Sequence, residues 1–415
     1  MLRLVPILIV LLLPPCLAGP DRLNVLAIGQ VLPGQSPIPD WFDADPLVDY
    51  VLVPTDVDVT SSVFASGKYG TDEAWRRYIR IYFPKTRKQL VENFDFFVFP
   101  DGYIDPFTPR QISDIKFAIT IGLGSFLTTG GDLSSPSARD YPGWKSSVLN
   151  EILPIELNDK MKQDGSAFSI SVIKKDPPLL SMFIPLGIES FKGRFAFTYL
   201  TTRPGANVWA KLRSPTLPST ASGDWLVSWR VGDKGGIFWV VADDLDSTWW
   251  SPMYGPCENA YAMDVFFNIL LYSTGRLLPE DVSSVHRVRQ MYWRFNEEKL
   301  LLFSLLDFVD RFGASTRKIE EAVERFDSLK EESFDQYRKQ EFESAFLTME
   351  GVLKEMKAAS DEAMRLKDRA LLWVYLTEWF TVTGTLFITL FVTYTLLVKR
   401  SLYREVGTTA YRGGH

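Results

Sequence analysis

The sequence predicts an α/β fold with a mainly parallel sheet, followed by long helices and one membrane-spanning segment. The stretch NFDFFVFPDG, a helical run over Pro109–Thr120 and the stretch GSFLTTGGD form a strand–helix–strand pattern within residues 95–132. Buried strands joined by one helix run parallel, and helices cover both faces of such a sheet. Long helical patterns begin at Val285. The residues from Trp379 to Val398 carry no charge, and their number matches the length that a bilayer core requires.

The first 18 residues have the pattern of a secretory signal peptide. Arg3 precedes an apolar stretch that is short for a membrane span, and small residues follow at Ala18 and Gly19. We expect cleavage after Ala18, and an uncleaved N-terminal anchor is the alternative. Cys16 stands in a poor lipoprotein box because two prolines precede it, so lipidation is not expected.

The predicted α/β domain covers residues 19–280. We expect strands at Arg22–Ile28 and Val48–Val53 and the two strands of residues 95–132, a short helix leading into an edge strand within Pro142–Leu157, and strands with loops within Ser166–Arg213. Expected helices are Thr71–Tyr82, with Thr71 as N-cap, Pro109–Thr120 and Tyr261–Ser273. Asp224–Asp243 reads as a hairpin, because two apolar strands flank the turn residues Gly-Asp-Lys-Gly.

The second domain is a predicted helical stalk over residues 283–376. One helix covers Val285–Phe312, and Ser315 can cap a second helix that runs to the membrane. The second helix carries heptad-like spacing at Phe342, Phe346, Met349, Leu353, Met356, Ser360 and Ala363. The first helix either folds back on the second as a hairpin, or two chains pair as a coiled coil.

Charge around the apolar segment predicts the topology. The span is placed at residues 377–398, and the basic tail at 399–415 includes Lys399 and Arg400. The positive-inside rule assigns that tail to the cytoplasm, and the signal peptide assigns everything before the span to the outside. We therefore expect a single-pass, type I protein of the plasma membrane.

Composition excludes several classes of function. Apolar residues make up 46% and aromatic residues 14% of the chain, which excludes global disorder. The formal net charge is −6, and an acidic exterior argues against binding of nucleic acid or of an anionic membrane surface. After signal cleavage Cys257 is the only cysteine left, so no intramolecular disulfide is expected.

Several motifs carry a resemblance to a known family: NFDFFVFPDG, SFLTTGGD, EILPIEL, the Gly-Asp-Lys-Gly hairpin turn and VVADDLDSTWW. With these motifs, residues from about Leu23 to Leu277 resemble the class I glutamine amidotransferase-like superfamily. The chain looks most similar to the divergent amidotransferase domains of prokaryotic envelope proteins. The resemblance implies a flavodoxin-like three-layer sandwich.

The residues that active members of this superfamily use for catalysis are missing. Active members carry a cysteine nucleophile on the turn after the central strand and a His–Glu pair after a late strand. Here the turn reads Thr-Thr-Gly-Gly over residues 128–131, and the late strand ends in Ala-Asp-Asp over residues 242–244. The two histidines lie elsewhere, at His286 and His415, and Cys257 has no base near it in sequence. Thr129 can replace the nucleophile only if a nearby aspartate acts as its base. The alternative is that these residues have no catalytic role and that Gly130 and Gly131 only turn the chain tightly.

Polar residues at the predicted strand ends are the candidate site. The candidate ligand-binding residues are Asp101, Gly102, Thr129, Gly130, Gly131, Asp132, Asp243, Asp244 and Trp249. Asp243, Asp244 and Asp246 are candidate ligands of Ca²⁺ or Mg²⁺, because several carboxylates converge if these loops share one edge. Asp56 and Asp58 follow another predicted strand. The alternative is that these are ordinary loop and N-cap aspartates.

Aromatic pairs and a threonine face complete the candidate features. Trp249-Trp250 and Trp41-Phe42 either line a groove for a sugar or peptide or pack in the core. Threonines recur every fourth residue from Thr377 to Thr393. That face either supports self-association in the membrane or bonds back to its own helix.

These observations lead to three hypotheses. The first is a membrane-anchored, non-catalytic envelope protein whose amidotransferase-like domain binds a ligand or a partner protein. The second is a metal-assisted hydrolase that uses the aspartate cluster. The third is a structural oligomer assembled through the stalk and the threonine face.

Overall fold

The computed structural model describes residues 22–34, 36–55, 72–129, 140–157, 163–194, 197–216, 223–253, 255–312 and 316–410. They form two compact units. The α/β unit comprises the described residues up to Trp293 together with Phe334–Phe346, and the helical unit comprises Arg294–Ser333 and the described residues from Leu347 onward. The predicted signal peptide and the last residues of the predicted tail lie outside the described residues.

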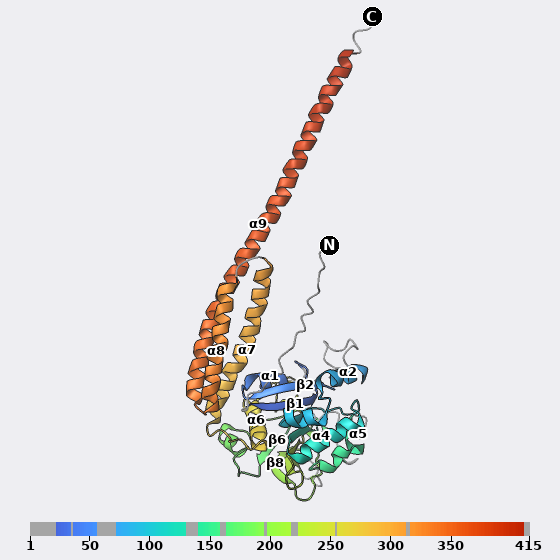
Figure 1. Cartoon of the computed structure of the whole chain (residues 1–415), viewed down its shortest axis with the longest axis vertical. Coiled ribbons are helices and arrows are strands. Elements are labelled where there is room, and N and C mark those ends of the chain that lie inside the picture. Colours follow the sequence, from blue (N-terminus) through green and yellow to red (C-terminus); the bar gives the residue numbers. More distant parts are fainter. Residues whose placement is uncertain are drawn as a thin grey trace, which may run out of the picture. The chain divides into compact units, whose positions relative to one another are not determined.

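Within the described residues, an eight-stranded sheet forms the centre of the α/β unit, in the order β2-β1-β3-β4-β10-β9-β8-β6. Figure 1 labels β1, β2, β6 and β8 of this sheet. The strands are β1 (Leu23–Gly29), β2 (Val48–Pro54), β3 (Phe96–Phe99), β4 (Gly124–Thr128), β6 (Ser169–Val172), β8 (Asn207–Arg213), β9 (Asp224–Arg230) and β10 (Ile237–Val241). Neighbours from β2 through β10 run parallel, and β10, β9, β8 and β6 pair antiparallel. This confirms the predicted α/β fold with a mainly parallel sheet.

Helices and two short strands complete the α/β unit. The helices are α1 (Ile38–Ala44), α2 (Asp72–Tyr82), α3 (Arg87–Asn93), α4 (Pro109–Ile121), α5 (Asp140–Ser146), the 3₁₀ helices η2 (Val148–Ile152) and η3 (Ser181–Leu186), and α6 (Ala262–Ser273). Strands β5 (Gln163–Asp164) and β7 (Phe197–Thr198) pair separately. Every residue of β3 and β10 is buried, which explains why these central strands are continuously apolar.

The boundaries of most predicted elements agree with the structure within two residues. The central helix α4 begins where its sequence signals it, because Thr108 and Gln111 form a reciprocal capping box. The predicted edge strand after Pro142 is wrong. Instead, the Ser147 side chain accepts a hydrogen bond from the Leu149 amide and starts η2, and only an isolated bridge joins Ile155 to Thr202.

The helical unit is built from parts of three helices, α7 (Val282–Arg311), α8 (Arg317–Arg338) and α9 (Phe342–Ala410), which lie side by side in Figure 1. Ion pairs join Lys299 to Asp327 and Arg325 to Glu355. The buried apolar residues of this unit include Leu302, Val309, Val323, Phe326, Met349, Met356 and Ala363. Three of them, Met349, Met356 and Ala363, recur every seven residues, as the predicted heptad spacing requires.

The single second helix predicted from Ser315 to the membrane is wrong. The chain reverses between α8 and α9 at Gln340, whose φ is 63°. The Gln340 amide donates to the Tyr337 carbonyl at 3.0 Å. A left-handed residue ends a helix efficiently, but it is usually glycine or asparagine, and this turn therefore has no signature in the sequence. Ser315 itself lies outside the described residues.

The C-terminal half of α9 is apolar. Among the described residues, α9 is the helix that is long and apolar enough to cross a membrane, and its most apolar window has a mean hydropathy of 1.8 with none of it buried. The threonine face is hydrogen-bonded within the helix: the hydroxyl groups of Thr381, Thr385, Thr389 and Thr393 each donate to the carbonyl four residues earlier. These hydroxyl groups therefore have partners without any second helix.

Candidate functional site

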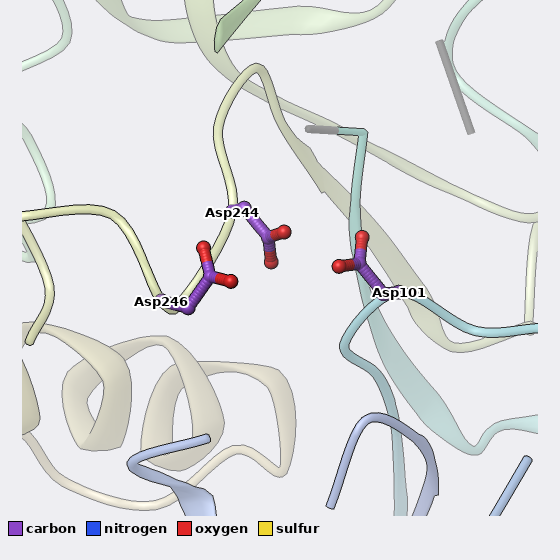
Figure 2. Close-up of side chains that lie close together, drawn as sticks. All are labelled: Asp101, Asp244 and Asp246. Carbon is purple, nitrogen blue, oxygen red and sulfur yellow. The ribbon is translucent and has the colours of Figure 1, made fainter. Parts of the chain in front are cut away.

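Three aspartate side chains, here called the acidic cluster, converge at one edge of the sheet (Figure 2). Asp101 follows β3, and Asp244 and Asp246 follow β10; one carboxylate oxygen from each lies within 4.8 Å of the others. Asp101 and Asp244 are buried, and Asp246 is half-buried. Since β3, β4 and β10 are adjacent parallel strands, the cluster lies at their carboxyl ends, where open α/β sheets bind ligands.

The turn after β3 fixes the position of Asp101. Its φ of 43° is left-handed, a conformation that aspartate tolerates better than most residues. The Asp101 amide donates to Oγ1 of Thr128 at 2.9 Å, and the Gly102 carbonyl accepts from Nε1 of Trp144 at 2.7 Å. A Cβ on Gly102 would lie 2.9 Å from Cβ of Phe99. This turn is therefore fastened to β4 on one side and to α5 on the other.

The chain after β10 folds into a turn that presents Asp244 and Asp246 on the same side. The Leu245 amide donates to the Asp244 carboxylate at 2.7 Å, and the Ser247 amide donates to the Asp244 carbonyl at 3.1 Å. Strand β7 closes over the end of β10, because the Thr198 amide donates to the Ala242 carbonyl at 2.8 Å. The backbone around the acidic cluster is thus held by hydrogen bonds from two directions.

Asp243 lies outside the acidic cluster although the sequence groups it with Asp244 and Asp246. Its side chain is 0% exposed, and Oδ2 accepts from Oγ of Ser247 at 2.9 Å. Oδ1 has no hydrogen-bond partner among the described residues. Burial, and to a smaller extent the nearby Asp244 charge, raises the pKa of Asp243 well above its ordinary value. Asp101 therefore takes the third position of the expected carboxylate group.

Thr129, the residue considered above as a replacement nucleophile, is fully buried. Its amide and its hydroxyl group both donate to the Val241 carbonyl, at 3.1 and 2.9 Å. The Thr129 carbonyl accepts from the Thr198 hydroxyl group. The hydroxyl group of Thr129 therefore joins β4 to β10 and is not presented for reaction. The other candidates Gly130, Gly131, Asp132, Asp56 and Asp58 lie outside the described residues.

Trp249 belongs to a buried group of three indoles, here called the tryptophan cluster. Its ring centroid lies 4.6 Å from that of Trp225 and 4.5 Å from that of Trp250. Trp225 and Trp250 stack with centroids 5.6 Å apart and an interplanar angle of 15°. Trp249 is 0% exposed, so the structure assigns this candidate ligand residue to the core.

A second group of polar residues was not expected from the sequence. Cys257 and His286, 29 positions apart in the chain, both line a cavity of about 350 Å³ that also includes Trp41 and Trp250. The Cys257 thiol donates to the Trp249 and Asn259 carbonyls, and burial raises its pKa. Because the thiolate is the nucleophilic form, this geometry does not activate Cys257.

His286 belongs instead to a buried ionic network. Nδ1 of His286 lies 2.6 Å from the Asp264 carboxylate, and Nε2 contacts Gln290 at 2.8 Å. The same Asp264 pairs with Arg289 at 2.7 Å. The sequence could have signalled this network only through a charged residue on the apolar face of each helix, since its members are far apart in the chain.

Comparison with known proteins does not assign the chain to a family. No protein-family model matches the chain, and no curated protein matches it at a significant level.

Proposed function

We propose that the protein is a membrane-anchored, non-catalytic binding module of the cell envelope, with its ligand site at the carboxyl edge of the parallel sheet. The observation that carries this proposal is the convergence of Asp101, Asp244 and Asp246 at that edge, beside a buried and hydrogen-bonded Thr129. A site with carboxylates but no activated nucleophile is suited to holding a ligand.

The proposed fold is the flavodoxin-like sandwich of the amidotransferase-like superfamily. Its support is the order of the five parallel strands, β2-β1-β3-β4-β10. Numbered by their appearance among these five, they follow the order 2-1-3-4-5 that is typical of flavodoxin-like sheets. The acidic cluster then occupies the edge where the resemblance expects the catalytic residues of active relatives.

The proposed topology is single-pass and type I in the plasma membrane. A signal peptide at residues 1–18 directs the α/β domain outward, residues 377–398 cross the bilayer, and the basic tail stays in the cytoplasm. The apolar second half of α9 supports the span. Lys399 and Arg400 at its end support the orientation.

A divalent cation fits the acidic cluster. Carboxylate oxygens are the ligands that Ca²⁺ and Mg²⁺ prefer, and mutual repulsion between carboxylates this close favours uptake of a cation. Asp101, Asp244 and Asp246 would hold the ion, and the remaining coordination positions would be open to water or to an anionic group of the ligand.

The test is thermal unfolding of the full chain in detergent, with and without Ca²⁺ or Mg²⁺. Saturating ion should raise the Tm by about 5 °C, because binding to the folded state alone stabilises it. D244N/D246N should abolish the shift, and D233N, in the exposed hairpin turn, should retain it. If neither ion shifts the Tm, the proposed cation binding at the acidic cluster is wrong. If the purified protein releases ammonia from glutamine, the proposal that the domain is non-catalytic is wrong.

A metal-assisted hydrolase is the second candidate, since the acidic cluster also suits a cation that activates water. This candidate predicts ion-dependent hydrolysis of an ester or phosphoester substrate that D244N/D246N abolishes. A purified protein that binds the ion but hydrolyses none of a broad ester and phosphoester panel would favour the binding module.

A further inference from the structure

An apolar groove runs between α7 and α9 within the helical unit. It has a volume of about 650 Å³. Its residues are Glu298, Leu301, Ser304, Leu305 and Phe308 of α7 and Lys357, Ser360, Met364 and Lys367 of α9. Leu301 is 65% exposed and Met364 42% exposed. The apolar walls therefore face outward and are not needed to close the three-helix packing.

Two lysines give this groove a charged rim. Among the described residues, Lys357 and Lys367 take part in no ion pair, and Nζ of Lys367 lies 3.6 Å from Sδ of Met364. Glu298 is the acidic residue on the opposite wall. An apolar channel with cationic groups along one side complements an anionic amphiphile, because the lysine stems extend the apolar surface while their charges stay at its edge.

The groove is continuous with the apolar half of α9. From Lys367 to Trp373 there are six residues of uninterrupted helix, which correspond to about 9 Å along the axis. Trp373, Tyr375 and Trp379 are 63%, 65% and 63% exposed, and such aromatic residues mark the membrane interface. The proposed span begins at Thr377, ten residues or about 15 Å along the axis after Lys367, so Lys367 lies close to the outer surface of the bilayer when the apolar half of α9 spans it.

We propose that this groove binds an anionic phospholipid, with one acyl chain along Leu301, Leu305 and Phe308 and the phosphate on Lys367. The inference rests on the proposed membrane anchoring. Lys357 lies ten residues before Lys367 on the same helix, about 15 Å away along the axis, so the groove covers the greater part of an acyl chain. A zwitterionic headgroup such as phosphocholine also carries a phosphate, but Lys367 repels its choline cation, and the site therefore prefers lipids with a net negative charge.

The experiment is native mass spectrometry of the full chain in a mild detergent, with added phosphatidylglycerol or phosphatidylcholine. Phosphatidylglycerol should bind as one molecule per chain at least about tenfold more tightly, as paired charges with partial burial allow. L305W fills the groove and should abolish binding, and K357Q/K367Q should weaken it about tenfold or more. K354Q changes an exposed lysine of α9 outside the groove and should bind as the unmodified chain does.

Equal binding of the two lipids, or equal phosphatidylglycerol binding by the unmodified chain and K357Q/K367Q, would overturn the proposal. A dimer that L305W dissociates would overturn it as well, because a second copy would then occupy the groove. K357Q/K367Q keeps every apolar wall residue, so its result stands even if L305W fails to fold. Alkaline extraction of membranes tests the anchoring separately: release of the unmodified chain contradicts the anchor whatever the lipid result.

Discussion

Arg289 is a buried cation held by two buried carboxylates. It is 1% exposed, and its guanidinium group lies 2.7 Å from both Asp45 and Asp264, which are 2% and 1% exposed. The Tyr337 hydroxyl group adds a hydrogen bond to Asp45 at 3.0 Å. Three charges removed from water depend on one another, and loss of one leaves the others without compensation. This network therefore stabilises the packing of α1, α6 and α7 against one another.

Replacement of Arg289 by alanine should lower the free energy of unfolding by about 3–5 kcal/mol, because Asp45 and Asp264 lose their counter-charge in a buried site. Urea unfolding of the full chain in detergent measures the change. The matched control is R287A, two residues away, which removes a half-exposed pair with Glu343 and should cost about 1 kcal/mol or less. If both variants lost the same free energy of unfolding, the buried network would not have this stabilising role.

Cys257 is the residue whose reactivity the structure constrains most directly. Burial raises its pKa, so less thiolate is present at pH 8 than in an ordinary thiol. In a C16A background, alkylation of the folded chain at pH 8 should be several-fold slower than that of the urea-unfolded chain. The difference should narrow as the pH rises, because the folded thiol ionises at higher pH. Alkylation of the folded chain at or above the unfolded rate at pH 8 would show that the thiol is activated.

At the scale of elements, the close approach of β1 and β3 depends on Gly29. Its φ is 142°, and a Cβ there would lie 1.9 Å from the Pro100 carbonyl oxygen. That carbonyl accepts a hydrogen bond from the Gln30 amide at 2.7 Å, just before Asp101. The end of β1 thus helps to place the turn that carries one member of the acidic cluster.

The variant G29A should lose about 2–5 kcal/mol of stability through backbone strain and forced displacement of the Pro100 turn. It should also weaken the cation-dependent thermal shift, because Asp101 moves with that turn. G34A is the control: Gly34 also has a positive φ, of 77°, but open space around it, so about 1–2 kcal/mol is expected. Thermal and urea unfolding measure both, and a G29A variant as stable as G34A would disprove the steric argument.

Most elements of the α/β unit were predictable because their signals are local. β3 and β10 are apolar at every residue, and the hairpin of β9 and β10 has strong turn residues between two apolar runs. The break at Gln340 was not predictable, since a left-handed glutamine has no distinctive local pattern. The strand order was also beyond local reasoning, because it depends on contacts between residues far apart in the chain.

The acidic cluster was likewise predictable only in part from local sequence patterns. That aspartates after several parallel strands meet at one edge follows from the βαβ pattern. The membership of the cluster depends on the shape of the turn that follows β10. Asp244 and Asp246 share one side, whereas Asp243 turns inward to Ser247. No local sequence pattern marks Asp243 as the aspartate that points away from the cluster, or Asp101 as the residue that replaces it.

For the whole molecule, the decisive prediction concerns attachment to the membrane. A chain ending after Ala370 lacks the apolar half of α9 and should be recovered in the soluble fraction, whereas the full chain should resist alkaline extraction. The reason is that the removed segment is the only described helix with the length and hydropathy of a span. Cell fractionation with an antibody to the α/β domain measures both chains. Membrane retention of the shortened chain would point to a different anchor.

The tryptophan cluster gives the protein a built-in optical reporter. Indoles as close as Trp225, Trp249 and Trp250 share their electronic excitation, so their near-ultraviolet circular dichroism depends on the angles between the rings. Trp249 and Trp250 belong to the same loop as Asp244 and Asp246. Any occupant that shifts this loop therefore changes a spectrum that needs no label, and ligands can be screened against the unmodified chain.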